Sequence, residues 1–265
     1  MGHGENEEVL IAVKDLRLKY GAGKNSILAL ENIDLTINRS DFLCVLGPSG
    51  CGKSTLLKVI AGYVQPTGGS CLMQGEPIEG PDRHRGVVFQ SSTLYPWMSV
   101  KENVEFGPRM RGLPEEEINE IRSHFLEQVN LSGSEEQYTF ELSGGMKQRV
   151  ALARVLANNP QVILMDEPFG ALDALTRGKM QTLIRKVWKE NNTTIFFITH
   201  DVNEALALGT KIVVLSQRPA KVLQKFDVDF TNEIYKSGSR DVMYNDEYVK
   251  IKKEILDLIY GQIED

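Results

Sequence analysis

The sequence predicts an α/β fold with a mostly parallel sheet, an antiparallel β part near the N-terminus and a helical insert. Apolar and polar residues alternate over much of the first quarter of the chain, which favours paired strands. Continuous apolar runs at residues 42–46, 162–166 and 194–199 are typical of buried strands, and helical patterns follow them. Strands and helices that alternate in this way form largely parallel sheets.

The elements can be assigned in order along the chain. The predicted strands are residues 9–20, 27–37, 42–46, 70–75, 86–90, 162–166, 194–199 and 212–215. The turn-forming residues GAGKNS separate the first two strands, which we therefore predict to pair with each other. A glycine-rich stretch after residues 42–46 leads into STLLKVIAG, which has helical spacing, so a strand, a loop and a helix follow one another.

Residues 91–150 have a different, helical character. SVKENVEF and PEEEINEIRSHFLEQV are predicted helices, and Pro114 suits the first turn of the second one. We therefore predict a single domain over residues 1–265, with a core in 1–90 and 151–220, a helical subdomain in 91–150 and a C-terminal tail in 221–265. The tail ends in an amphipathic helix.

Composition disfavours several classes of protein. The chain has 265 residues, 42% of them hydrophobic, and its formal net charge of -6 does not attract nucleic acid. Cys44, Cys51 and Cys71 are an odd number without metal-type spacing, which indicates reduced thiols in a cytosolic setting. No run approaches 18 apolar residues and the N-terminus has no basic stretch before an apolar one, so we expect a chain that neither spans a membrane nor is secreted.

Residues 47–55, GPSGCGKST, match the phosphate-loop pattern G-x-x-x-x-G-K-[ST] through Gly47, Gly52, Lys53 and Ser54. The glycines let backbone N–H groups turn towards phosphate oxygens, and the N-terminus of the following helix adds positive potential. In this pattern the lysine reaches the terminal phosphates and the serine hydroxyl binds Mg²⁺. The sequence therefore predicts that residues 47–55 bind a nucleoside triphosphate.

Polar side chains follow three other predicted strands. Asp166 and Glu167 end one buried strand, and ligands bind beyond the carboxyl ends of parallel strands. Asp166 is predicted to hold Mg²⁺, and Glu167 to polarise an attacking water. His200 and Gln90 follow two more strands and are candidates to contact the γ-phosphate or the water.

LSGGMKQRV, residues 142–150, predicts a second anion-binding helix terminus. Ser143 suits an N-cap, while Gly144 and Gly145 permit close approach of the backbone. One chain thus carries two predicted phosphate-binding segments. Either the helical insert folds back onto the first segment, or two chains share each nucleotide.

Taken together, these motifs resemble those of the ATP-binding subunit of ABC transporters over nearly the whole chain. GPSGCGKST is similar to the Walker A motif, LSGGM to the signature motif, VILMDE to Walker B with its catalytic glutamate, and FGALD to the D-loop that ends at Asp173. Gln90 resembles the Q-loop glutamine, His200 the switch histidine, and Tyr20 the aromatic residue that stacks on adenine.

The resemblance implies a P-loop ATPase fold, ATP and Mg²⁺ as cofactors, and a head-to-tail dimer. Glu167, His200 and Gln90 would be catalytic, and Ser54, Gln90 and Asp166 would hold Mg²⁺. The residues expected to contact nucleotide are Tyr20, Gly47, Pro48, Ser49, Gly50, Cys51, Gly52, Lys53, Ser54, Thr55, Gln90, Ser143, Gly144, Gly145, Met146, Asp166 and Asp173. Each ATP would lie between the 47–55 loop of one chain and residues 143–146 of the other.

Met146, LYPWMSV around Trp97, and SQRPAKVL resemble the importer branch that handles nitrate, sulfonates, taurine or bicarbonate. This branch implies a second ATPase subunit, a membrane permease and, indirectly, an external solute-binding protein as partners, with the chain peripheral on the cytoplasmic face of the inner membrane. The alternatives are a soluble ABC ATPase that acts on nucleic acid or ribosomes, and a P-loop kinase or transferase.

Overall fold

The computed structural model describes residues 8–21, 23–239 and 241–262. The chain divides into two compact units, the first comprising residues 1–82 and 192–265 and the second residues 83–191. Residues 1–7, where a secretory signal was predicted to be absent, lie outside the described part. The predicted division into core, helical subdomain and tail stays a prediction.

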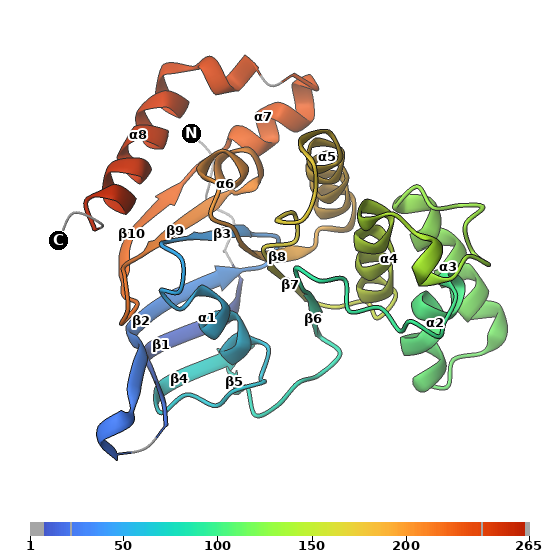
Figure 1. Ribbon diagram of the computed structural model, residues 1–265, viewed down its shortest axis with the longest axis horizontal. Coiled ribbons are helices and arrows are strands. Elements are labelled where there is room, and N and C mark those ends of the chain that lie inside the picture. The colour runs from blue at the N-terminus through green and yellow to red at the C-terminus, as the bar shows by residue number, and fades with distance from the viewer. Residues whose placement is uncertain (1–7, 22, 240, 263–265) are drawn as a thin grey trace. The chain divides into compact units, whose positions relative to one another are not determined.

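The first unit contains an antiparallel sheet and a group of mainly parallel strands (Figure 1). The antiparallel sheet has the order β2 (Ile27–Asn38), β1 (Val9–Tyr20), β4 (Gly68–Met73) and β5 (Glu76–Pro77). The second group has the order β10 (Val222–Asp227), β9 (Lys211–Leu215), β3 (Phe42–Leu46) and β8 (Thr194–Ile198). β3 runs parallel to β8 and β9, whereas β10 is antiparallel to β9. The α/β fold and the antiparallel N-terminal part are therefore confirmed.

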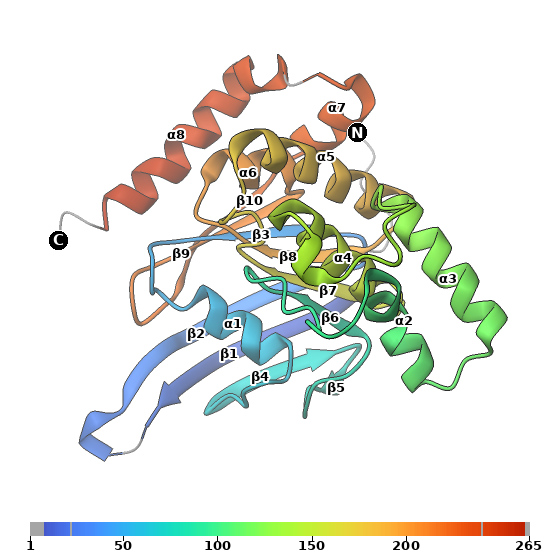
Figure 2. The ribbon, with the colours of Figure 1, turned by 45° about the vertical axis from the view of Figure 1, so that its right-hand side comes forward.

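Helices cover both faces of β3. The first unit contains α1 (Lys53–Ile60), α6 (Val202–Leu208), α7 (Phe230–Ser237), α8 (Asp246–Tyr260) and the short turns η1 (Gly23–Asn25) and η3 (Asp241–Tyr244). α1 contacts β2 and β8, while α6 packs on β3 and α8 contacts α6 and β9 (Figure 2). Because both faces are covered, all five residues of β3 are buried, as its continuous apolar run predicts.

The second unit contains one pair of parallel strands and the helical insert. Its elements are β6 (Arg85–Val88), α2 (Val100–Met110), α3 (Glu115–Gln128), η2 (Thr139–Glu141), α4 (Gly144–Leu156), β7 (Val162–Asp166) and α5 (Ala174–Asn191). α4 contacts α2, α3, α5 and β6, so it is the centre of the packing in this unit.

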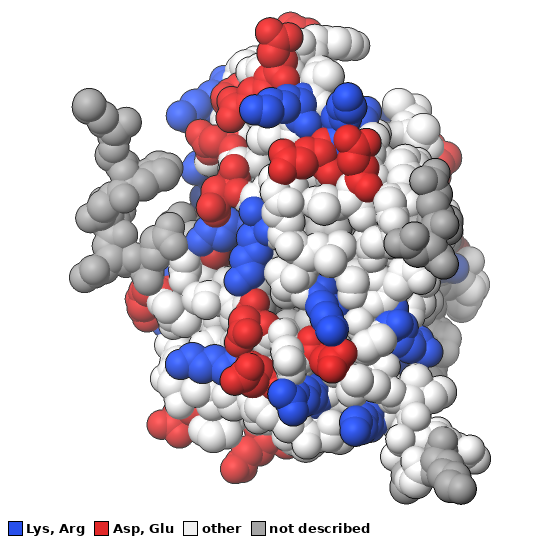
Figure 3. All heavy atoms as spheres, turned by 90° about the vertical axis from the view of Figure 1, so that its left-hand side faces the viewer, with Lys and Arg blue, Asp and Glu red and all other residues white. Residues whose placement is uncertain are grey.

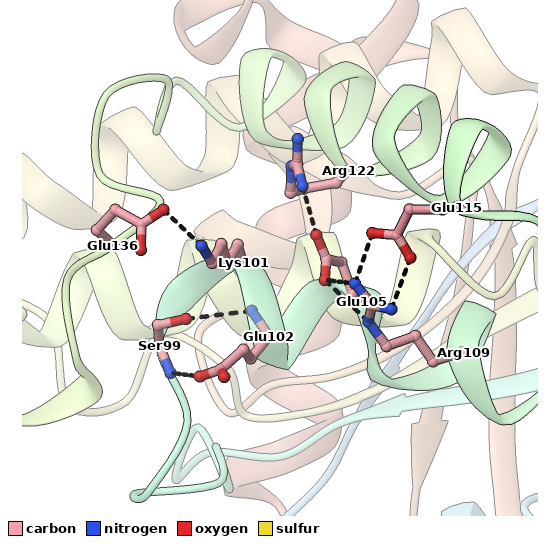
Figure 4. Close-up of polar contacts among 8 residues, drawn as sticks. All are labelled: Ser99, Lys101, Glu102, Glu105, Arg109, Glu115, Arg122 and Glu136. Carbon is pink, nitrogen blue, oxygen red and sulfur yellow. Dashed lines mark hydrogen bonds and ion pairs between the residues drawn. The ribbon is translucent and has the colours of Figure 1, made fainter.

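Local sequence explains how α2 begins and how it is held to α3. The Ser99 hydroxyl accepts a hydrogen bond from the Glu102 backbone N–H, and the Glu102 carboxylate accepts one from the Ser99 N–H, which forms a capping box. One turn later, the buried carboxylate of Glu105 accepts hydrogen bonds from Arg109 of the same helix and from Arg122 of α3 (Figure 4). The ion pairs thus fix the register between α2 and α3.

In residues 221–265, where the sequence predicts only a closing helix, the structure adds a strand and a helix besides the short turn η3. β10 and α7 lie within residues 221–265, before the predicted helix α8. The three cysteines are buried and free of disulfides, as expected. Among the described residues, no helix combines the length and the apolar composition needed to cross a bilayer.

Candidate functional site

The phosphate loop follows the buried strand β3 and leads directly into α1. Gly50 and Gly52 have φ angles of +73° and +132°, which residues with a side chain rarely adopt. A Cβ atom on Gly52 would lie 3.0 Å from Leu30 Cδ2 and 3.1 Å from the Ala29 carbonyl oxygen. The loop therefore needs glycine both for its backbone conformation and for its packing against β2.

Lys53 is held inside this loop. Its side chain is almost completely buried, and Nζ donates hydrogen bonds to the carbonyl oxygens of Gly47 at 2.8 Å and Pro48 at 3.0 Å. Ser54 and Thr55 follow in the first turn of α1. An ammonium group and a helix N-terminus at one loop create the positive potential that binds phosphate.

Tyr20 lies close to the start of α1, although 35 residues separate it from Thr55. It is the last residue of β1, and its side chain is 40% exposed. The hydroxyl lies 3.5 Å from Thr55 Oγ1. The structure thus brings an exposed aromatic ring to the phosphate loop, and its stacking on adenine stays a prediction.

Cys51 fills space beneath the loop. Its side chain is 1% exposed, and its sulfur would lie 3.0 Å from a Cβ atom on Gly47. Burial raises the pKa of the Cys51 thiol, although the charges of Lys53 and Arg218 act in the opposite direction. The thiol is therefore protonated near neutral pH, which supports the packing role over a redox role.

His200 reaches the same edge of the first unit. It comes two residues after β8, and the parallel register pairs Val45 of β3 with Ile198 of β8. The phosphate loop and His200 therefore follow the carboxyl ends of two neighbouring strands, β3 and β8. The next residue, Asp201, caps α6 by accepting hydrogen bonds from Asn203 N and Glu204 N, and this cap fixes the chain that follows the exposed histidine.

In the second unit, the parallel strands β6 and β7 carry the other polar strand ends. Val88 pairs with Met165, so Gln90 and the Asp166–Glu167 pair follow neighbouring strand ends. Glu167 has a φ angle of +45°, an uncommon backbone conformation for a residue with a side chain and one that occurs at functional sites. A Cβ atom on Gly170 would lie 2.7 Å from Gln90 Nε2, which places the Gln90 side chain beside the turn after β7.

The LSGGM segment forms the start of α4. The Ser143 hydroxyl accepts a hydrogen bond from Met146 N at 3.3 Å, which confirms the N-cap. Ser143 and Gly144 are exposed, while a Cβ atom on Gly145 would lie 2.7 Å from Thr176 Cγ2 of α5. Gly145 therefore permits the close packing of α4 on α5.

Asp173 caps α5 in the same unit. Its Oδ1 accepts hydrogen bonds from Leu175 N and Thr176 N, both at 3.0 Å. Hydrogen bonds from Thr176, and a further one from Leu175, lower the pKa of the Asp173 carboxyl. The side chain is therefore a carboxylate at neutral pH, on the exposed end of α5.

Gln148 is a residue that the sequence analysis missed. It is 5% exposed, and Nε2 donates hydrogen bonds to the carbonyl oxygens of Phe89 at 3.2 Å, Gln90 at 3.1 Å and Pro168 at 2.8 Å. One amide thus ties the chain after β6 and the chain after β7 to the helix that begins with LSGGM. In the sequence, the only indication of this role is an amide side chain among the apolar residues of the predicted helix. The sequence does not show which carbonyl oxygens accept its hydrogen bonds.

The oxygen atoms of Ser54, Asp166 and Gln90 are of the type that Mg²⁺ prefers. Among the described residues no group of three or more His, Cys, Asp and Glu side chains could hold a metal ion. The carboxylate and amide oxygens of Asp166 and Gln90 in the second unit suit an Mg²⁺ ion that phosphates also bind, because this ion keeps few protein ligands.

Each unit thus gathers part of the predicted site. The first unit brings together Tyr20, residues 47–55 and His200. The second brings together Gln90, Asp166 and Glu167, and it carries residues 143–146 and Asp173 on the ends of α4 and α5. These groups can bind phosphate, hold a divalent cation and accept a proton from water.

Comparisons with known proteins agree with this chemistry. The family described as "ABC transporter" matches residues 30–170. Taurine import ATP-binding protein TauB of Roseobacter denitrificans is 48% identical, with 96% of each chain covered, and TauB of Escherichia coli is 43% identical, with 96% of this chain and 99% of the relative covered. A dimeric post-hydrolysis structure of the ATP-binding cassette MJ0796 with ADP and Pi matches with a TM-score of 0.73 and 32% identity, covering 83% of this chain and 99% of that one. The chain therefore belongs to the ABC transporter family, as one of its ATP-binding, ATP-hydrolysing proteins.

Proposed function

We propose that this chain is the ATPase subunit of an importer for taurine. The observation that carries the proposal is the identity of 48% and 43% to two taurine import ATP-binding proteins over 96% of the chain. The sequence motifs alone are equally compatible with nitrate, other sulfonates and bicarbonate, and taurine is the substrate that the names of these relatives favour.

The residues described above supply the steps of ATP hydrolysis. Residues 47–55 bind the phosphates, Lys53 neutralises their charge, and Tyr20 stacks on the adenine. Ser54, Asp166 and Gln90 would hold Mg²⁺, which would supply charge compensation on the transferred phosphate. Glu167 accepts a proton from the attacking water, and His200 contacts the γ-phosphate or orients that water.

The second phosphate-binding segment serves a second chain. Ser143 and Gly144 are exposed at the start of α4, where they can meet the nucleotide held by another copy. We propose a head-to-tail dimer in which residues 143–146 of one chain complete the site of the other. Asp173 lies at the start of α5, in the same unit, and belongs to the same interface.

A membrane permease is the second proposed partner, and it places the chain on the cytoplasmic face of the inner membrane. Trp97 and Phe140 are 70% and 74% exposed, and the Phe140 ring stacks on Tyr138. A short β-bridge joins Ser99 to Tyr138, so these rings belong to neighbouring segments of the second unit. Exposed aromatic groups of this kind mark protein interfaces. The permease would in turn receive taurine from an external solute-binding protein.

We do not propose nucleic acid as a partner. The face drawn in Figure 3 shows Lys and Arg mixed with Asp and Glu, without a stripe of basic side chains. A continuous basic stripe is the usual footprint of proteins that bind the phosphate backbone.

Taurine uptake by a deletion strain tests the substrate and the permease surface together. We expect the strain to lose radiolabelled taurine uptake, and the wild-type chain to restore it. Trp97→Ala/Phe140→Ala should fail to restore uptake while the purified variant keeps its ATP turnover. Unchanged taurine uptake in the deletion strain, with loss of nitrate, bicarbonate or alkanesulfonate uptake, would replace the proposed substrate.

Glu167→Gln tests the catalytic assignment. The change keeps the size of the side chain but removes the base, so we expect ATP affinity within about twofold of wild type and turnover lowered by about 10²-fold or more. Nucleotide binding and phosphate release measure the two quantities. Full turnover in this variant would remove Glu167 from the catalytic role.

A further inference from the structure

The last residue of β9 and the segment that joins β9 to β10 pack against the phosphate loop at three points. A Cβ atom on Gly47 would lie 3.0 Å from the carbonyl oxygen of Leu215, and one on Gly52 would lie 3.3 Å from Ala220 Cβ. Between them, Arg218 Nη2 donates a 2.8 Å hydrogen bond to the carbonyl oxygen of Gly50. The segment therefore borders the beginning, the middle and the end of the loop.

The contact of Arg218 fixes the orientation of one peptide group in the loop. In a trans peptide the carbonyl of Gly50 and the N–H of Cys51 point in opposite directions. Since Arg218 holds the carbonyl from one side, the N–H is directed to the other, where it donates to the carbonyl oxygen of Pro48 at 3.3 Å. Gly50 has a φ angle of +73° and no side chain to hold it, so this outside contact is a restraint on its conformation.

Gln262, two residues after α8, also contacts this segment. The backbone N–H of Gln217 donates to Gln262 Oε1 at 2.6 Å, and Gln217 Nε2 donates to the backbone carbonyl of Gln262. Gln262 Nε2 in turn donates to the Leu258 carbonyl of α8 at 2.8 Å. A chain of contacts thus runs from α8 through Gln262, Gln217 and Arg218 to Gly50.

The segment is also anchored to the sheets of the first unit through Ala220. Ala220 N donates to the Ala29 carbonyl at 3.0 Å, and Glu31 N donates to the Ala220 carbonyl at 2.9 Å. Ala220 is buried, whereas Gln217 and Arg218 are exposed apart from the contacts described above. The Ser216 hydroxyl donates to the carbonyl oxygens of Gln217 at 2.8 Å and Pro219 at 3.1 Å, so the turn holds its own backbone and Gln262 adds a contact from the C-terminal end.

We propose that Arg218 is a positioning residue for the phosphate loop and that the C-terminal end of α8 sets nucleotide affinity through it. The inference rests on the proposed function, in which residues 47–55 bind the phosphates of ATP. Arg218 holds the Gly50–Cys51 peptide, and with it the turn of the phosphate loop that begins at Pro48, and Gln262 contacts the residue before Arg218. The C-terminal helix is thereby linked to the ATP site.

Binding of a fluorescent ATP analogue to the purified full chain tests the proposal, with KM and kcat for ATP as the second readout. Arg218→Ala removes a charged hydrogen bond at the surface, and we expect the dissociation constant to rise about fivefold. KM should rise with it, while kcat stays within about twofold, because Arg218 acts on binding. Arg218→Lys keeps a donor for the Gly50 carbonyl and should recover most of the affinity.

Gln262→Ala should weaken binding about twofold, because the Gln262 backbone carbonyl still holds Gln217. The double variant Arg218→Ala/Gln262→Ala should bind no more weakly than Arg218→Ala, since Gln262 acts through Arg218. Glu254→Ala is the matched control. It removes the 2.7 Å hydrogen bond from Gln224 Nε2 of β10 to α8 but leaves Gln262 and Arg218 intact, so affinity should not change.

Two outcomes overturn the proposal: unchanged affinity in Arg218→Ala, or effects of Arg218→Ala and Gln262→Ala that add. Lys53→Ala separates this failure from failure of the proposed function. If Lys53→Ala abolishes binding and Arg218→Ala does not change it, only the inference is wrong. If Lys53→Ala binds as the wild-type chain does, the phosphate loop is not the nucleotide site.

Discussion

Gln148 joins three segments that are far apart in sequence. Its amide is the donor to three backbone carbonyls, in the chain after β6 and the chain after β7, and the side chain is 5% exposed. Gln148→Leu removes this donor and leaves the carbonyls facing an apolar group. We expect the free energy of unfolding to fall by about 1–3 kcal/mol. Turnover should fall more than ATP affinity, because Gln90 and Glu167 adjoin the tied segments.

Urea unfolding and steady-state ATPase assays measure these effects. Lys147→Ala is the matched control, on the same helix and outside the hydrogen bonds that hold the two strand ends. The Lys147→Ala variant should unfold at the same urea concentration as the wild type. Equal turnover in Gln148→Leu and wild type would show that the strand ends keep their conformation without the amide.

For single residues, the sequence predicts their chemical roles better than it predicts their hydrogen-bond partners. The spacing of Gly47, Gly52 and Lys53 predicts a phosphate loop, because the glycines let backbone N–H groups turn towards phosphate oxygens and the lysine side chain reaches the phosphates. Gln148 could not be predicted, since its partners are 58, 59 and 20 residues away and are backbone atoms. The φ angle of +45° at Glu167 likewise could not be predicted, because nothing about a glutamate residue indicates this backbone conformation.

Among the elements, the pairing of α2 with α3 rests on a buried carboxylate. Glu105 is 2% exposed and lies 2.8 Å from Arg109 and 2.5 Å from Arg122. Glu105→Leu leaves both guanidinium groups without this partner, although Arg109 keeps Glu115. We expect a loss of about 1–2 kcal/mol in the free energy of unfolding, because charged hydrogen bonds are lost while the Arg109 and Arg122 side chains, 48% and 22% exposed, can turn to water.

Denaturant unfolding at two salt concentrations checks this expectation. Glu136→Ala, which removes the exposed partner of Lys101, is the control and should unfold as the wild type does. A Glu105→Leu variant as stable as wild type would mean that apolar packing alone holds α2 on α3.

Sequence pattern predicts buried elements and misses edge strands for a physical reason. β3 and β8 are buried along their whole length, so their apolar runs are continuous and easily recognised. β10 has only Phe226 fully buried among residues VLQKFD, because it lies at the edge of its sheet. Its pattern is therefore weak, and the sequence analysis assigned it to the tail.

For the whole molecule, the decisive question is whether one chain or two complete each ATP site. Ser143→Arg places a bulky cation on the exposed cap of α4, and Lys53→Ala removes the charge inside the phosphate loop. Each variant alone should lose most ATP turnover, but only Lys53→Ala should lose nucleotide binding by the isolated chain. This difference follows because residues 143–146 are proposed to serve the partner's nucleotide.

Mixing the two inactive variants then distinguishes the arrangements. In a head-to-tail dimer, the Ser143→Arg chain supplies an intact phosphate loop and the Lys53→Ala chain supplies an intact Ser143 segment, so each mixed dimer has one complete site. Half of the dimers in an equal mixture are mixed, and each has one working site of two, so we expect about a quarter of wild-type turnover. If residues 47–55 and 143–146 of the same chain formed the site, the mixture would stay inactive, because no chain carries both. ATPase assays over a range of mixing ratios, with each variant alone as the control, provide the measurement.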